Sequence, residues 1–226
     1  MMKIAAPVLL LLLAGFAVAG PTPFPTRACP PIETVENEFT LGGCKPIIFF
    51  YARGSSEAYN MGNYTFSPGP PTAQGLEDIF GCENVAVEGI GYAARMDTNL
   101  LPGGADPAEV KMMRDLFLDA AGKCPYSILL GGGYSQGAAL CHRAIENLPE
   151  EVKDRIAGVA MYGDTQNTPD KGRIPKFPPE KTLIICNDQD VICNGNLTIT
   201  TPHGLYVQRV PEALAFFKKK VMAARY

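Results

Sequence analysis

The sequence predicts an α/β fold, a three-layer sandwich in which helices cover both faces of a central, mainly parallel five-stranded sheet. Two observations lead to this prediction. Short apolar runs rich in β-forming residues alternate along the chain with segments of helical periodicity. The 226 residues, 46% of them hydrophobic, can bury one full core, and no linker, repeat or second composition zone divides them. We therefore expect a single domain with the sheet in its interior.

The expected strands are the apolar runs at 46–52, 84–90, 126–132, 156–163 and 182–186. The expected helices lie between and after them, at 71–80, 107–123, 136–147, 149–155 and 211–224. The helix at 107–123 has the clearest start, because Asp106 is a good N-cap, Pro107 suits the first helical position and Glu109 stands three residues after the cap. This spacing is typical of a capping box.

The N-terminus has the layout of a secretory signal peptide at residues 1–19. Lys3 precedes an apolar block, and the small residues Ala17 and Ala19 stand before Gly20. The block is too short and too weakly flanked for a membrane anchor, and no later segment resembles a membrane span. A proline-rich, extended arm at 20–40 and one folded domain at 41–226 should follow. We expect a secreted, extracellular protein without stable membrane insertion.

The charge pattern excludes some partners. The formal net charge is −3 and no long basic run is present, so nucleic acid is not an expected partner. Lys218, Lys219 and Lys220 are read as the solvated end of the last helix, where cations complement the helix dipole. We expect a small acidic monomer.

If the protein is exported, most of its seven cysteines should form disulfides, because an oxidising compartment favours pairing. An odd number leaves at least one thiol unpaired. Their spacings include neither a C-x-x-C motif nor a Cys/His zinc pattern, so no metal site is expected. Cys141, on the expected helix 136–147, is interpreted as a small buried hydrophobic residue. The others are Cys29, Cys44, Cys82, Cys124, Cys186 and Cys193.

The segment Gly133-Tyr134-Ser135-Gln136-Gly137 has the pattern G-x-S-x-G and joins a predicted buried strand to a predicted helix. A serine at so sharp a turn has strained backbone angles, and side chains two residues before and after it would collide with neighbouring backbone. The helix that follows would direct its N–H groups toward a developing oxyanion. The alternative is an ordinary glycine-rich or phosphate-binding loop. The strand before the motif and the helix after it favour Ser135 as a nucleophile.

A serine nucleophile needs a histidine base and a carboxylate to orient it. His142 lies seven residues beyond Ser135, about 10 Å along the same helix, so His203 is the only candidate base. The carboxylate is expected in the loop 186–193, which a disulfide between its end cysteines would close. Spacing alone does not choose between Asp188 and Asp190, and a merely stapled turn is the alternative. The order Ser, Asp, His is that of α/β-hydrolase esterases.

Five segments together resemble the cutinases, a family of small secreted serine esterases. The resemblance runs from about Cys44 to the last helix, and its segments are FYARGSSE (50–57), GGGYSQGAAL (131–140), DKGRIPKFP (170–178), CNDQDVIC (186–193) and PHGLY (202–206). It implies a lidless α/β-hydrolase that cleaves carboxylic esters, with cutin-type polyesters and short-to-medium acyl esters as substrates. It also implies that neither a metal nor an organic cofactor is needed.

The resemblance assigns further roles. It selects Asp190 as the acid, Ser55 and the backbone N–H of Gln136 as the oxyanion hole, and Asn99 as the residue that orients Ser55. It makes Met96, Leu197 and Ile199 the lips of the acyl-binding groove, and it pairs Cys44 with Cys124 and Cys186 with Cys193.

The chain departs from the family pattern at two places. Gly204 follows the histidine, where the family usually has a bulky apolar residue, so one wall of the groove is expected to be more open. Cys29 and Cys82 stand outside the four-cysteine pattern. We expect these two to pair and to tie the arm to the edge of the sheet, which leaves Cys141 unpaired.

Other interpretations stay open at this stage. The same fold and motifs serve acetylxylan esterases, and a secreted elicitor or recognition protein could keep the fold without the chemistry. Asn63 and Asn196 each begin an N-x-T sequon, a possible glycan site in a eukaryotic host. A glycan at Asn196 would lie close to the acyl lips, which argues against its occupancy. The sequence between Ser135 and His203 contains no long amphipathic insert that could form a lid. We therefore expect an exposed site.

Overall fold

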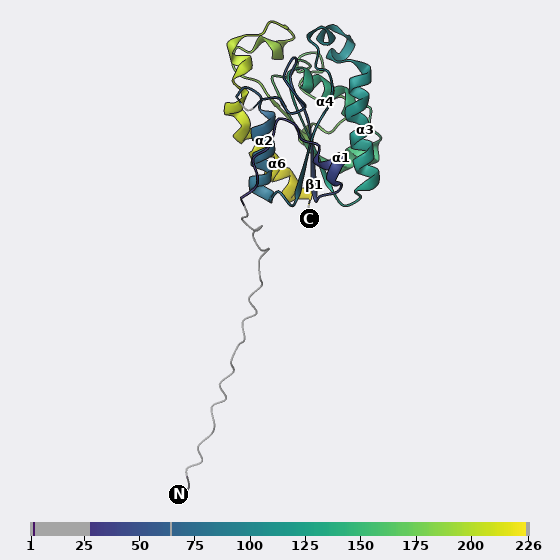
Figure 1. Ribbon diagram of the computed structural model, residues 1–226, viewed down its shortest axis with the longest axis vertical. Helices are drawn as coiled ribbons and strands as arrows, with labels where there is room; N and C mark the ends of the chain where they lie inside the picture. Colours follow the sequence, from purple (N-terminus) through teal and green to yellow (C-terminus); the bar gives the residue numbers. More distant parts are fainter. Residues whose placement is uncertain (1, 3–27, 64, 225–226) are drawn as a thin grey trace.

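The computed structural model describes residues 2, 28–63 and 65–224 (Figure 1). Apart from Met2, the predicted signal peptide lies outside the described residues, as do residues 20–27 of the predicted arm.

The described chain forms a five-stranded sheet in which every neighbouring pair of strands is parallel. The spatial order is β2-β1-β3-β4-β5. The predicted fold class is confirmed, and each strand lies within two residues of its predicted bounds. The strands are β1 (Ile47–Ala52), β2 (Val85–Gly89), β3 (Ile128–Tyr134), β4 (Ile156–Tyr162) and β5 (Thr182–Ile185).

The strand order places a switch point beside β1. The chain leaves β1 for β2 on one side and then builds the rest of the sheet from β3 on the other side. Connections diverge at such a point, so the carboxyl ends of β1 and β3 border a crevice in which ligands commonly bind. The G-x-S-x-G turn stands at the carboxyl end of β3.

Helices cover both faces of the sheet (Figure 1). One face packs against α3 (Pro107–Lys123), α4 (Gln136–Glu146) and the short α1 (Glu38–Gly42) and α5 (Glu150–Arg155). The other face packs against α2 (Gly69–Phe80) and α6 (Val210–Ala224). Helix α1 was not predicted because five residues are too few to show a helical period. The same holds for the 3₁₀ turns at 96–100, 102–104, 179–181, 191–194, 201–204 and 206–209.

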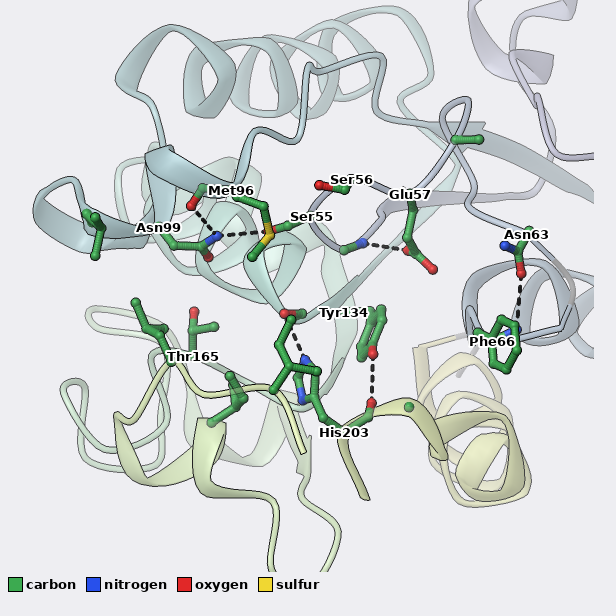
Figure 2. A pocket seen from close by; sticks show the side chains of 18 residues that line it. Ser55, Ser56, Glu57, Asn63, Phe66, Met96, Asn99, Tyr134, Thr165 and His203 are labelled. Carbon is green, nitrogen blue, oxygen red and sulfur yellow. Dashed lines mark hydrogen bonds between the residues drawn. The ribbon is translucent and has the colours of Figure 1, made fainter. Parts of the chain in front are cut away.

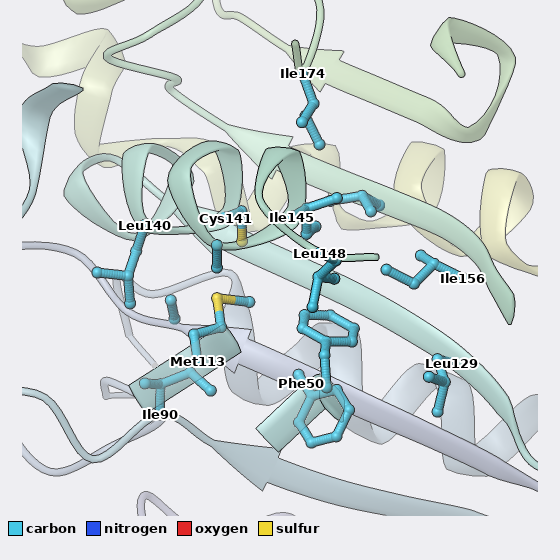
Figure 3. Packing of buried hydrophobic residues seen from close by; sticks show 14 of the residues in the cluster. Phe50, Ile90, Met113, Leu129, Leu140, Cys141, Ile145, Leu148, Ile156 and Ile174 are labelled. Atoms are coloured by element: carbon cyan, nitrogen blue, oxygen red, sulfur yellow. The ribbon is translucent and has the colours of Figure 1, made fainter. Parts of the chain in front are cut away.

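The apolar strand sequences reflect burial on both faces of the sheet. All six residues of β1 are buried, with Phe50 in the core under α3 and α4 and Phe49 in the core under α2 and α6. Figure 3 shows Phe50 and Met113 in the first of these cores, together with Cys141 of α4. Since no face of β1 meets water, its sequence is continuously apolar rather than alternating.

The start of α3 is capped by Asp106 alone. The Asp106 carboxylate accepts a hydrogen bond from the N–H of Ala108 at 2.7 Å. The predicted capping box is wrong, because the Glu109 carboxylate accepts the N–H of Ala93 at 2.9 Å instead. A neighbouring segment offers Glu109 a backbone donor that the sequence pattern does not reveal. This contact ties the first turn of α3 to the chain that follows β2.

Three disulfides fasten the chain. They join Cys29 to Cys82, Cys44 to Cys124 and Cys186 to Cys193, the same pairs as expected from the sequence. The described part of the arm lies along β2, where Asn37 forms an antiparallel bridge with Glu88 and the carbonyl of Glu36 accepts the N–H of Gly89 at 2.9 Å. The arm therefore covers an edge of the sheet that would otherwise expose unpaired backbone groups.

Candidate active site

Ser135 occupies a strained turn between β3 and α4, with φ 55° and ψ −118°. The flanking glycines are required by close backbone packing. A Cβ added at Gly133 would lie 2.4 Å from the carbonyl oxygen of Gly137, and one added at Gly137 would lie 2.0 Å from that of Ala52. No other residue type fits either position, which is the steric reason given above for the pattern. The turn presents the Ser135 hydroxyl at the carboxyl edge of the sheet.

Three side chains far apart in the sequence meet in one line of hydrogen bonds. The Nε2 atom of His203 lies 3.0 Å from the Ser135 oxygen, and its Nδ1 atom lies 2.8 Å from Oδ2 of Asp190. Because an ionised carboxylate only accepts hydrogen bonds, Nδ1 carries the proton and Nε2 can accept the serine O–H. His203 and Asp190 are 3% and 2% exposed. Asp188, the other aspartate of the loop, is exposed.

The sequence reasoning missed two tyrosines that enclose this line. Tyr206 donates its O–H to Oδ2 of Asp190 at 2.6 Å. Tyr134 stacks on the His203 ring, with centroids 5.1 Å apart, and donates its O–H to the His203 carbonyl at 2.6 Å. Burial raises the pKa of both phenols, aided at Tyr134 by the charges of Glu57 and Asp190 and at Tyr206 by its hydrogen bond to Asp190, so both stay neutral donors. Proximity to Ser135 and to His203 in the chain was the only signal that could have pointed to them.

Ser55 lies across the pocket from His203 and is held by Asn99, as Figure 2 shows. The Asn99 side-chain amide donates to Ser55 Oγ at 2.8 Å and to the carbonyl of Met96 at 3.0 Å. Since Ser55 accepts this bond, its own O–H remains able to donate elsewhere.

Two groups of Gln136 lie at this site, its backbone N–H and its side-chain amide. Its backbone N–H is at the first position of α4, where no intrahelical partner exists. Its side-chain amide donates to the carbonyl of Arg95 at 2.8 Å and to the hydroxyl of Thr98 at 2.6 Å. This side-chain contact was not predicted. It anchors the turn 96–100, which carries Asn99, to the start of α4.

The loop after β1 is braced by Glu57. Its carboxylate accepts the N–H of Gly54 at 2.7 Å, and its backbone carbonyl accepts the Nε–H of Arg53, also at 2.7 Å. Burial raises the pKa of Glu57, although the Gly54 hydrogen bond opposes this effect. These bonds hold the loop on both sides of Ser55.

Ser135 and His203 line a pocket of about 580 Å³. Figure 2 shows this pocket with His203 at one side of it. The three predicted lip residues, Met96, Leu197 and Ile199, all line it and are 50%, 39% and 62% exposed. Gly204 lines it without a side chain. The apolar lining also includes residues that were not predicted, namely Ala58, Phe66, Leu100 and Ile192.

The second histidine is enclosed elsewhere. His142 is fully buried, with Nε2 2.9 Å from Asp164 Oδ2 and Nδ1 2.7 Å from Asp170 Oδ2. Cys141 beside it is also fully buried and unpaired, and its thiol donates to the carbonyl of Gly132 at 3.1 Å. Neither residue reaches the pocket.

The described part of the chain shows neither a membrane span nor a metal-ligand cluster. None of its helices combines the length and the apolar character that crossing a membrane requires. Across the same residues, no three His, Cys, Asp or Glu side chains gather as possible ligands of a metal ion.

Comparison with known proteins gives one consistent family. The sequence model of the cutinase family matches residues 43–221. Cutinase CUT2 of Pyricularia oryzae is 45% identical over 190 residues, which cover 84% of this chain and 87% of that protein. The structure of Trichoderma reesei cutinase in complex with a phosphonate inhibitor is similar, with a TM-score of 0.73 and 29% identity over 84% of this chain and 81% of that one.

An acetyl xylan esterase structure shares the fold at a TM-score of 0.63, with 16% identity over 79% of this chain and 99% of that one. At that identity the likeness concerns the fold alone. The sequence matches agree with the fold and with the G-x-S-x-G turn at Ser135. The chain therefore belongs to the cutinase family and is a carboxylic ester hydrolase of the cutinase type.

Proposed function

We propose that this protein is a secreted serine esterase that hydrolyses cutin-type polyesters and short-to-medium acyl esters through an acyl-enzyme on Ser135. The observation that carries the proposal is the line of hydrogen bonds from Ser135 through His203 to Asp190 beneath an open, mainly apolar pocket.

In the acylation step His203 Nε2 takes the Ser135 proton while the serine oxygen attacks the ester carbonyl. The imidazolium that forms donates from Nδ1 to Asp190, whose negative charge stabilises it. His203 then gives the proton to the departing alcohol. The 3.0 Å distance between Nε2 and the serine oxygen allows this transfer without a rearrangement.

The oxyanion of the tetrahedral intermediate is assigned to the Ser55 O–H and the Gln136 backbone N–H. The bond from Asn99 to Ser55 and the position of Gln136 at the start of α4 support this assignment. Water activated by His203 then attacks the acyl-enzyme, and the acid is released.

The pocket supports an acyl chain rather than a sugar as the group nearest the serine. Met96, Leu197 and Ile199 offer apolar contact at its rim, and Gly204 leaves one wall without a side chain. A polymer chain that could not enter a closed cavity can reach a pocket with an open rim of this kind.

Labelling with a fluorophosphonate probe tests the nucleophile. Wild-type protein should be labelled on Ser135, Ser135→Ala should not be labelled, and Ser56→Ala should react like wild type. Ser56 is the matched control because it also lines the pocket. Folded wild-type protein that resists the probe would refute the mechanism.

A series of soluble esters with increasing acyl length tests the substrate class. We expect kcat/KM to rise from acetate to medium-length acyl chains, because each buried CH₂ contributes about 0.8 kcal/mol. A preference for acetate over all longer chains would instead favour an acetylxylan esterase.

A further inference from the structure

The loop that follows the 3₁₀ turn 191–194 contains a feature that ester hydrolysis does not use. Its sequence Asn196-Leu197-Thr198 is an N-x-T sequon, the acceptor of N-linked glycans in proteins that cross the eukaryotic secretory pathway. All residues from 194 to 199 are exposed. The segment lies outside the ring closed by Cys186 and Cys193, so closure of that ring does not bury it.

The backbone at Asn196 is anchored, whereas the residue as a whole is exposed. The Asn196 N–H donates to the carbonyl of Val191 at 3.1 Å, and its side-chain oxygen accepts the N–H of Thr198 at 3.0 Å. Within the described residues no hydrogen bond from the side-chain Nδ2 is found. This nitrogen is the atom that a glycan would occupy, and a glycan attached there would displace no interaction of the fold.

The structure leaves Asn196 next to a lip residue but outside the pocket lining. Leu197 and Ile199 line the acyl pocket, whereas Asn196 and Thr198, which alternate with them, do not. A glycan on Asn196 would therefore stand beside the rim without filling the pocket. Asn63 of the other sequon is itself a lining residue, so a glycan there would project from inside the mouth.

We propose that Asn196 is an N-glycosylation site and that its glycan limits access of flat, insoluble polyester to the pocket, while small soluble esters still enter. This inference rests on the proposed secretion and esterase activity. Chemically, the Asn196 Nδ2 atom forms a bond to the anomeric carbon of a lipid-diphosphate-linked oligosaccharide. The bond from that carbon to the diphosphate oxygen breaks, the lipid diphosphate leaves, and the amide loses one proton.

Occupancy is tested on the full chain, with its own leader, secreted by a eukaryotic host. Peptide-N-glycosidase treatment in heavy-oxygen water converts a glycosylated Asn196 to a mass-tagged aspartate. We expect the tag on wild type, its loss in Thr198→Ala and its retention in Thr198→Ser, which preserves the sequon. Recovery of the secreted wild-type peptide with an unmodified Asn196 would overturn the inference.

The effect of the glycan is tested by comparing secreted wild type with Asn196→Gln. We expect equal turnover of a soluble ester but several-fold faster release of acid from an insoluble polyester film by Asn196→Gln. The same two chains made in a bacterial periplasm, where this glycan is not added, should hydrolyse the film equally. Equal film hydrolysis by the glycosylated and unglycosylated forms contradicts the access role.

These measurements separate this inference from the proposed function. A chain secreted by the eukaryotic host that hydrolyses soluble esters but carries no glycan at Asn196 refutes only the glycan proposal. A glycosylated chain without esterase activity refutes the proposed mechanism and the access role, while leaving Asn196 as a modification site.

Discussion

At the scale of single residues, the Asp190 carboxylate is held by three hydrogen bonds. Its carboxylate accepts hydrogen bonds from His203, from the Tyr206 O–H and from the N–H of Ile192 at 2.8, 2.6 and 3.1 Å. A buried charge is stable only with such partners. The tyrosine and the backbone hold the carboxylate toward His203, so we propose Tyr206 as a positioning residue.

Replacing Tyr206 by Phe should lower kcat on a soluble ester about tenfold and leave KM unchanged, since a hydrogen bond to a charged group contributes about 1.5 kcal/mol or more. Tyr162→Phe is the matched control. It also removes a buried phenol O–H, paired with Thr72 at 2.8 Å, but lies outside the line from Ser135 to Asp190. Steady-state kinetics of the two folded variants give the comparison, and equal kcat values would exclude the role of Tyr206.

Ser55→Ala should lower kcat by about 10²-fold or more with little change in KM, because a donor aimed at an oxyanion acts mainly in the transition state. Ser56→Ala provides the reference, since Ser56 is adjacent and exposed. Loss of activity that is no greater in Ser55→Ala than in Ser56→Ala would remove Ser55 from the oxyanion hole.

At the scale of secondary-structure elements, an ion cluster joins α4 to the loop after β4. His142 of α4 lies between the carboxylates of Asp164 and Asp170, and Arg143 also contacts Asp170. Two carboxylates require both ring nitrogens to donate, so the imidazole is protonated. The same loop donates from Thr168 to the carbonyl of Cys193 at 2.9 Å. The loop after β4 is thus joined to α4 by the cluster and to the loop 186–193 by Thr168.

Because of this cluster, the free energy of unfolding should decrease as the solution becomes alkaline. Burial by itself lowers the pKa of His142, but the charges and hydrogen bonds of Asp164 and Asp170 outweigh it and raise the pKa to about 9, from an ordinary value of 6.5. The stabilisation is therefore fully present below pH 6.5 and is lost as the pH rises through about 9. Its size is on the order of 3 kcal/mol.

Urea unfolding of wild type and His142→Gln at neutral pH and above the His142 pKa checks this prediction. The variant should be less stable at neutral pH, and the difference should shrink at alkaline pH. Other groups that titrate in this range are common to both proteins and cancel in the difference. A difference that does not change with pH would show that the charge of His142 has no such role.

At the scale of the whole molecule, the disulfides divide between the two edges of the sheet. Cys82 and Cys44 precede β2 and β1, and Cys124 precedes β3, so two bridges lie at the amino edge. Only Cys186–Cys193 lies at the carboxyl edge with the site. The bridges at the amino edge therefore stabilise the fold away from Ser135, His203 and Asp190.

Replacing Cys29 and Cys82 together by serine should lower the free energy of unfolding by about 2–4 kcal/mol. The bridge joins residues 53 apart, and without it the unfolded chain regains the conformational entropy that this loop restricts. The kcat on a soluble ester should not change. Denaturant unfolding measures the first effect, and mapping of non-reduced peptides from wild type verifies the pair. A bridge from Cys141 to Cys29 or Cys82 in that map would contradict the assignment.

The strands, the main helices and the G-x-S-x-G turn could be predicted from the sequence because each depends on a local pattern. Apolar runs report burial on both faces, and the glycines around Ser135 report a turn that excludes side chains. His203 could be singled out because the chain has only two histidines and His142 is too far along its helix. In these cases short-range geometry is already decisive.

Other features were decided only by the packing of distant segments. Residue spacing left Asp188 and Asp190 equivalent, and the fold buries one beside His203 and exposes the other. Tyr206 contacts Asp190 because its turn packs against the loop 186–193, and Glu109 leaves its expected cap because another segment lies within reach. A hydrogen bond needs its two atoms within about 3 Å, and only the tertiary structure sets such distances between residues far apart in the chain.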